Sequence, residues 1–155
     1  MIDQQPVGSF AAFIFEPILS AGGILEPPEG YIKRMCAECR KRGMLIIADE
    51  SQTGLGRTGD IFAFQREDVV PDIVTLSKTI ECGLPGASVS TTAEIARVVL
   101  ERGFLWVTTH LNDPLMAAVG SKVIEIVLRD DLSSGLLANV WLLLDRLVYL
   151  GWHRR

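Results

Sequence analysis

The fold class of this 155-residue chain follows from Met44-Leu45-Ile46-Ile47-Ala48-Asp49-Glu50 and its counterpart Ile73-Val74-Thr75-Leu76-Ser77-Lys78. In each sequence an apolar run of strand length is followed at once by polar residues. Continuous apolar runs are typical of strands in a parallel sheet that is covered on both faces. In open α/β sheets, ligands bind beyond the carboxyl ends of such strands. We therefore expect Asp49 and Lys78, which end two strands, to face one shared site.

Further strands and helices complete this pattern. Residues 11–15 form a third apolar run, and it stops at Glu16-Pro17 because proline cannot continue a central ladder. Short strands are also expected at 87–90 and 105–107, and helices at 31–42, from about 92 to 101, 114–129 and 136–150. The expected fold class is α/β, a three-layer αβα arrangement with a mostly parallel sheet.

Two of the expected helices have an apolar face. In the helix at 31–42, Tyr31, Met35 and Cys39 recur at four-residue spacing, and Gly43 is suited to end the helix. In the helix at 114–129 the apolar face is formed by Leu115, Val119, Val123 and Ile126. Asp113-Pro114 is a good start for that helix, with an N-cap followed by proline in the first turn.

The composition excludes several classes of function. A net charge of −4 without a basic cluster argues against nucleic acid as the main partner. No apolar run approaches the roughly 20 residues of a membrane span, and residues 1–9 lack the apolar core of a secretory signal. Three cysteines in such a chain indicate free thiols in a reducing compartment. We expect a cytoplasmic location, with a mitochondrial one still open.

A lysine and an acid at neighbouring strand ends match the needs of a pyridoxal phosphate site. A lysine amine bonds covalently to the aldehyde of that cofactor, and an acid keeps its pyridine nitrogen protonated. Lys78 is therefore the candidate covalent anchor and proton carrier, and Asp49 is the candidate partner of the ring nitrogen. The alternative is an acid in a turn and a solvated lysine without a ligand.

Two other motifs favour structural interpretations. Cys36-Ala37-Glu38-Cys39 is formally a C-x-x-C motif, but it lies within a helix and lacks the further ligands of a zinc site. Gly54-Leu55-Gly56-Arg57-Thr58-Gly59 matches the dinucleotide-binding pattern G-x-G-x-x-G. Two preceding acids would repel a pyrophosphate, and no sustained helical period follows at 60–70. The glycines are better explained by a tight turn beside a cofactor.

Four segments of the chain resemble class III aminotransferases, a pyridoxal phosphate-dependent family. The matching segments are FIFEPILSAGG at 13–23, ADESQTGLGRTG at 48–59, LSKTIECGLP at 76–85 and TTHLNDP at 108–114. Within the family they are most similar to the 2,2-dialkylglycine decarboxylases, which couple decarboxylation to transamination. Ala21 departs from that branch, which carries a serine there.

The resemblance implies roles for further residues. Gln52 would contact the hydroxyl side of the cofactor ring, and Glu16 would lie beside cofactor and substrate. Thr109 would donate its hydroxyl to the cofactor phosphate in the partner subunit, which implies a homodimer with shared sites. An alkali metal ion would be bound by Asp113 and by the backbone carbonyls of Thr109 and Leu111; a plain N-cap role for Asp113 is the alternative.

The resemblance also implies a domain organisation and an activity. Residues 1–131 would be a partial cofactor-binding large domain, and 132–155 a helix leading towards a small C-terminal domain. The implied activity is transamination between an amino acid and a 2-oxo acid, with decarboxylation, a lyase reaction, left open. The alternatives are an inactive remnant that binds the cofactor weakly or pairs with a full-length relative, and, more remotely, a dinucleotide-binding oxidoreductase.

Overall fold

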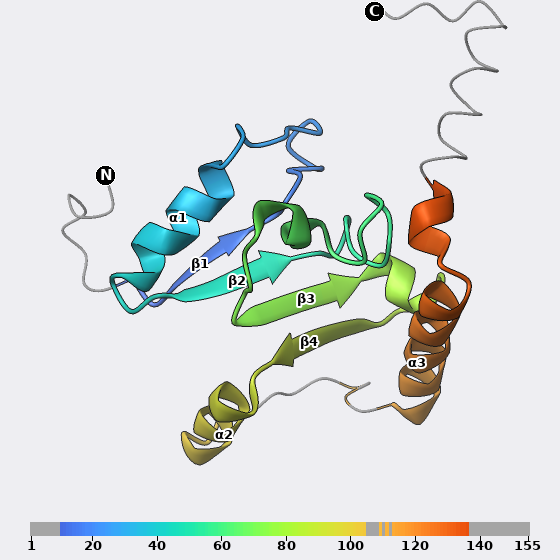
Figure 1. Cartoon of the computed structure of the whole chain (residues 1–155). Helices are drawn as coiled ribbons and strands as arrows, with labels where there is room; N and C mark the ends of the chain where they lie inside the picture. Colours follow the sequence, from blue (N-terminus) through green and yellow to red (C-terminus); the bar gives the residue numbers. More distant parts are fainter. Residues whose placement is uncertain (1–9, 105–108, 110, 112, 137–155) are drawn as a thin grey trace, which may run out of the picture.

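The sheet that was expected from the apolar runs forms the centre of the molecule. The computed structural model describes residues 10–104, 109, 111 and 113–136. Four strands lie in the order β1-β2-β3-β4 (Figure 1). Their bounds are Ala12–Phe15 for β1, Leu45–Asp49 for β2, Ile73–Ser77 for β3 and Ala87–Thr91 for β4. The first three strands are parallel and β4 is antiparallel to β3, so the mostly parallel sheet is confirmed.

The helical segments also follow the sequence pattern. They are α1 (Tyr31–Arg40), α2 (Ala93–Glu101) and α3 (Pro114–Arg129), with short 3-10 helices η2 (Ala63–Glu67) and η3 (Lys78–Glu81). The Thr92 hydroxyl caps α2 by accepting from the backbone N–H of Ile95 at 3.3 Å. The strand expected at 105–107 and nearly all of the helix expected at 136–150 lie outside the described residues.

Helix α1 packs on the sheet through a face that only partly matches the expected one. Its buried residues are Ile32, Cys36 and Cys39, whereas Tyr31 is 43% exposed. They join Phe15 and Ile46 in one apolar cluster. The prediction of a Tyr31–Met35–Cys39 face is correct at Cys39 but wrong at Tyr31. Two apolar stripes overlap on this helix, and contact with the strands selects the stripe that starts at Ile32. The helix ends at Arg40, and the turn after it closes at Gly43 with a left-handed φ of 70°.

A second apolar cluster joins α3 to the end of β3. Leu55, Leu76 and Ile80 are buried there, with Val123 of α3 packed against them. Figure 1 shows α3 lying across the end of the sheet to which β3 points, beside η3. The expected face of α3 is correct at Val123 but wrong at Leu115, which is 60% exposed at the start of the helix. Only the later turns of α3 have η3 beneath them, which explains the difference.

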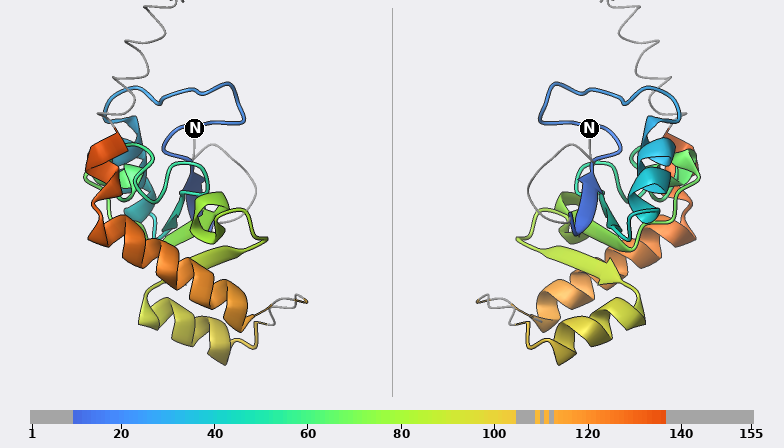
Figure 2. Two further views of the ribbon diagram at one scale, coloured as in Figure 1. Left: turned by 90° about the vertical axis from the view of Figure 1, so that its right-hand side faces the viewer. Right: turned by 90° about the vertical axis from the view of Figure 1, so that its left-hand side faces the viewer.

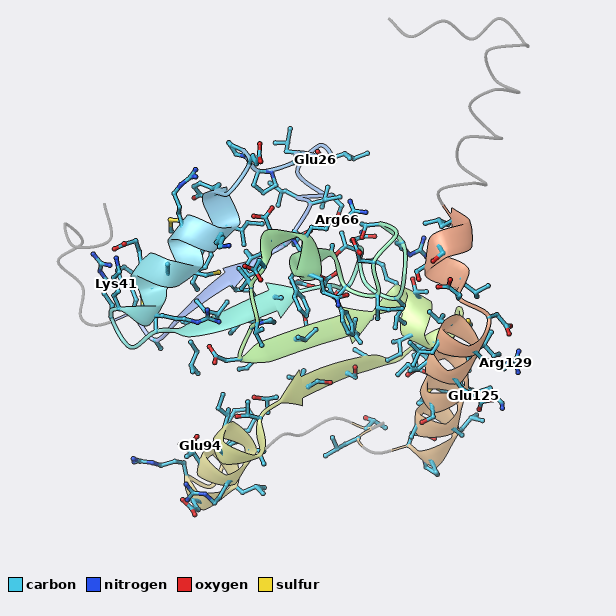
Figure 3. All side chains as sticks on the ribbon, in the orientation of Figure 1. Glu26, Lys41, Arg66, Glu94, Glu125 and Arg129 are labelled. Carbon is cyan, nitrogen blue, oxygen red and sulfur yellow. The ribbon has the colours of Figure 1, made fainter. Side chains whose placement is uncertain are left out.

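The two faces of the sheet differ in how they are covered. Helix α1 and η2 lie over one face, as the two side views also show (Figure 2). On the opposite face Ile14 is 60% exposed and Val89 is 55% exposed. Charged side chains such as Lys41, Glu125 and Arg129 lie on the outside of the helices, away from the strands (Figure 3). In the described parts of the chain, no helix is long and apolar enough to cross a membrane.

Candidate functional site

Three of the expected site residues lie at the carboxyl ends of the three parallel strands. The register pairs Phe15 with Ala48 and Asp49 with Thr75, so β1, β2 and β3 end close to one another at the same edge. Glu16 follows β1, Asp49 is the last residue of β2, and Lys78 follows β3 directly. The structure therefore places the three charged residues that end the apolar runs at the same edge of the sheet.

Asp49 is held in its charged form by hydrogen bonds. Its Oδ1 accepts from the backbone N–H of Ser51 at 3.0 Å and from the hydroxyl of Thr75 at 3.1 Å. Burial raises the pKa of Asp49, but the hydrogen bonds from Ser51 and Thr75 outweigh burial and lower it below the ordinary value. The positive charge of Lys78 lowers the pKa of Asp49 further.

Lys78 has a strained backbone conformation. Its φ is 53°, in the left-handed region that residues other than glycine seldom adopt, and it begins η3. Such a residue costs of order 1–3 kcal/mol and persists only where its surroundings impose it. Here the apolar contacts of Leu76 and Ile80 hold both sides of the lysine. The Lys78 side chain itself is exposed and accessible to a ligand.

The loop between β2 and η2 is anchored to both neighbouring elements. Glu50 is 1% exposed, and its Oε1 accepts from the backbone N–H of Phe64 at 2.8 Å. Its Oε2 accepts from the hydroxyl of Thr53. Arg57 Nε donates to Thr79 Oγ1 at 2.7 Å, so the loop is also joined to the residue after Lys78.

The glycine pattern serves close packing in this loop. A Cβ on Gly54 would lie 2.7 Å from Cδ2 of Leu76 and 2.9 Å from the carbonyl oxygen of Glu50, so only glycine fits. Gly56 has a φ of +88°. Residues 51–60 are turns and bends and the next helix is the short η2, which does not provide the long helix of a dinucleotide site. This geometry agrees with the structural interpretation of the glycines as parts of a tight turn.

The remaining predicted site residues lie in different environments. Gln52 is exposed on the loop, and Glu16 is half-buried with its Oε2 accepting from the Ser20 hydroxyl at 3.2 Å. Thr109 and Leu111 are exposed, and within the described contacts neither is joined to Asp49 or Lys78. Their roles remain predictions.

Asp113 has the N-cap role that was considered as an alternative to metal binding. Its Oδ1 accepts from the backbone N–H of Leu115 at 3.0 Å, with Pro114 in the first turn of α3. Across the described ranges, no group of three or more His, Cys, Asp or Glu side chains could hold a metal ion. The N-cap does not test the alkali-ion prediction, which also relies on backbone carbonyls.

The structural interpretation of the C-x-x-C motif is supported. Cys36 and Cys39 are both buried, and neither forms a disulfide. Burial raises the pKa of both thiols, which suppresses the reactive thiolate.

Several residues of the site were not identified from the sequence. Ser51 and Thr75 were missed although they hold Asp49, and Glu50 was treated only as a second acid beside it. The two-residue period of a strand could have revealed that Glu50 points away from Asp49. Glu81 was also missed: it is 5% exposed, and its Oε2 is buried without a hydrogen-bond partner in the described structure.

Comparison with known proteins gives consistent results in sequence and structure. The family model described as "Aminotransferase class-III" matches residues 2–152. The uncharacterized aminotransferase C1039.07c of Schizosaccharomyces pombe is 52% identical over 132 residues, which are 85% of this chain and 30% of that protein. Human mitochondrial alanine–glyoxylate aminotransferase 2 is 42% identical over 125 residues, 80% of this chain and 24% of that protein.

Solved structures agree with the fold class. The (S)-enantioselective omega-transaminase from Thermomicrobium roseum matches with a TM-score of 0.79 and 39% identity, over 90% of this chain and 32% of that chain. Ornithine aminotransferase from Toxoplasma gondii matches with a TM-score of 0.73 and 34% identity, over 79% of this chain and 29% of that chain. The expected α/β class is confirmed. The chain spans less than a third of the length of these relatives.

Proposed function

This chain belongs to the class III aminotransferase family, and we propose that it is the cofactor-holding part of a pyridoxal phosphate-dependent aminotransferase. The proposed reaction transfers an amino group from an amino acid to a 2-oxo acid. The observation that carries the proposal is the pair formed by Asp49 and Lys78. Asp49, a carboxylate that hydrogen bonds keep ionised, ends β2, and Lys78 directly follows β3, the neighbouring parallel strand.

The chemistry of these residues fits the cofactor. When bound, pyridoxal phosphate supplies an aldehyde that condenses with amines and a protonated ring that accepts electrons. The ionised carboxylate of Asp49 favours a proton on a ring nitrogen, because an opposite charge stabilises the charged form. The exposed amine of Lys78 is free to anchor the aldehyde and then to move a proton at the substrate Cα.

Other residues are assigned by family membership. Gln52, on the loop that Glu50 anchors, is proposed to contact the ring hydroxyl. Glu16 is proposed to lie beside the substrate, which agrees with its position after β1 at the same sheet edge. Thr109 is proposed to bind the phosphate in a partner subunit, which makes the functional unit a homodimer.

The proposed alkali-ion site can be tested separately from the helix cap. Asparagine caps helices about as well as aspartate, so Asp113→Asn should preserve the cap of α3 while removing the charge. If Asp113 binds a potassium or sodium ion, this variant should lose any dependence of cofactor binding on that ion. An unchanged dependence would exclude Asp113 as a ligand.

Decarboxylation-coupled transamination is a second candidate, suggested by the resemblance of the four matching segments at 13–23, 48–59, 76–85 and 108–114 to the 2,2-dialkylglycine decarboxylases. A dialkyl amino acid such as 2-aminoisobutyrate has no Cα hydrogen, so its turnover requires loss of carbon dioxide. Release of carbon dioxide with pyruvate as acceptor would support this branch. Turnover of alanine or ornithine without release of carbon dioxide would favour simple transamination.

Absorbance titration of the chain with pyridoxal phosphate tests the proposal directly. Lys78→Ala removes the proposed anchor, and Lys41→Ala is a matched control because Lys41 is an exposed lysine directly after α1. A visible band that needs Lys78 but not Lys41, with a borohydride-reduced adduct mapped to Lys78, is expected. Adducts scattered over surface lysines would refute the proposed anchor and favour an inactive remnant.

A further inference from the structure

Asp49 depends for its charge on a residue of the loop that follows it. Both the backbone N–H of Ser51 and its side chain stabilise the Asp49 carboxylate, together with Thr75 from β3. Thr75 is fixed by the ladder between β2 and β3. Ser51 belongs to no strand or helix, so something else must fix its position.

Glu50 provides that fixation from the opposite side of the strand. Successive side chains of a strand point to opposite faces, so Glu50 points away from Asp49. Its two oxygens accept from Thr53, near the start of the loop, and from the backbone of Phe64, beyond its far end. Its own backbone adds two bonds: its N–H donates to the Thr75 carbonyl at 3.0 Å, and its carbonyl accepts from Gly54 at 2.9 Å.

Glu50 is held by hydrogen bonds and takes part in no ion pair of the described residues. No ion pair among the described residues involves Glu50, although its side chain is 1% exposed. Burial of an unpaired carboxylate is costly unless hydrogen bonds satisfy it. The backbone N–H of Phe64 can only donate, so the side chain at position 50 must present an acceptor to it.

We propose that Glu50 is a positioning residue, whose carboxylate closes the loop 50–62 onto η2 and so keeps Ser51 bonded to Asp49. Any effect of Glu50 on cofactor binding rests on the proposed function, because Glu50 would act on the cofactor only through Asp49. Its effect on Asp49 itself does not require the cofactor, so the two ideas can fail independently.

The sign of the pKa change distinguishes this role from simple electrostatics. Removing a nearby negative charge lowers the pKa of an acid, so through space the variant Glu50→Ala should lower the pKa of Asp49. Loss of the bonds from Ser51 should instead raise it towards the ordinary aspartate value of about 3.9. Glu50→Gln should not raise it, because the amide oxygen still accepts from Phe64 and the Thr53 hydroxyl can reverse to accept.

The experiment is a carbon-13 NMR titration of the Asp49 carboxyl in the cofactor-free chain. Glu38→Ala serves as control, because Glu38 is an exposed glutamate on α1 whose loss should leave Asp49 unchanged. A higher pKa of Asp49 in Glu50→Ala, but not in Glu50→Gln, supports the proposal. The amide NMR spectrum of each variant must show that it remains folded.

An unchanged or lower pKa of Asp49 in a folded Glu50→Ala overturns the proposal. An equal rise in Glu50→Gln also overturns it, because the amide retains both contacts. If Glu50→Ala does not fold, the variant Thr53→Val is measured in its place, because it removes only the hydrogen bond from the Thr53 hydroxyl to the Glu50 carboxylate. A rise in the pKa of Asp49 in that variant supports the role of Glu50, and no rise overturns it.

Discussion

Glu81 fills a slot between two glycines, and this packing makes a sharp prediction about stability. A Cβ on Gly86 would lie 2.2 Å from Cγ of Glu81 and 2.5 Å from its Cδ. On the far side, a Cβ on Gly120 of α3 would lie 3.2 Å from Oε1 of Glu81. The φ of Gly86 lies outside the left-handed region, so alanine is disfavoured there by space alone.

Gly86→Ala should therefore destabilise the chain by overpacking. Such overpacking typically costs about 1–3 kcal/mol in free energy of unfolding. With an m-value of about 2 kcal/mol/M, the urea midpoint should fall by about 0.5–1.5 M. The penalty depends on Glu81, because the close atoms are Cγ and Cδ of that side chain.

A double-mutant cycle with Glu81→Ala tests this dependence. Truncation removes the clash and also removes a carboxyl oxygen that is buried without a partner in the described structure. Gly86→Ala should then cost little in the Glu81→Ala background, with a coupling free energy of about 1–3 kcal/mol. The assay is urea unfolding of the four chains, followed by circular dichroism.

Gly83→Ala provides the control in the same turn. A Cβ at Gly83 would meet nothing within 4 Å, but its φ is +98°, so its penalty should be conformational and independent of Glu81. Additive effects of Gly86→Ala and Glu81→Ala would refute the packing argument. If Glu81→Ala relieved the destabilisation of Gly83→Ala as much as that of Gly86→Ala, Glu81 would act on the whole turn and not through contact with residue 86.

Three further predictions concern other parts of the molecule. Thr92→Ala should cost about 1 kcal/mol in urea unfolding through loss of the α2 cap, whereas Thr92→Ser should not. The pKa of Asp49 is lower in the folded chain than its ordinary value, so its ionised carboxylate stabilises the fold above pH ~4, and this stabilisation is lost as the pH falls through the folded-state pKa. Asp49→Asn should therefore lose less free energy of unfolding than the unmodified chain when unfolding is measured at decreasing pH. Cys82 is exposed and Cys36 and Cys39 are buried, so a thiol reagent should label one cysteine rapidly, and Cys82→Ser should abolish that phase.

Much of the fold could be predicted because it depends on local patterns. The apolar runs at 44–48 and 73–76 became β2 and β3. The start of α3 at Asp113-Pro114 was also correct, because an N-cap and a proline act within one turn. Such features need only neighbours in sequence.

Errors occurred where distant segments decide the outcome. On α1 the choice between the Tyr31 and Ile32 stripes depended on Phe15 and Ile46, which belong to strands. Leu115 was expected to be buried, but η3 underlies only later turns of α3. Helical period gives the spacing of a face and leaves open which of two overlapping faces meets the core.

By itself the sequence determined where the two candidate residues for the chemistry lie. Asp49 and Lys78 end apolar strands, and parallel strands bring their carboxyl ends to one edge, so their shared location follows from pattern alone. Only the tertiary structure decided how Asp49 keeps its charge, through Ser51 and Thr75, and how Glu50 fixes the loop that carries Ser51. Hydrogen bonds and burial depend on distances of a few ångströms between segments, and a strand pattern specifies order and face without specifying those distances.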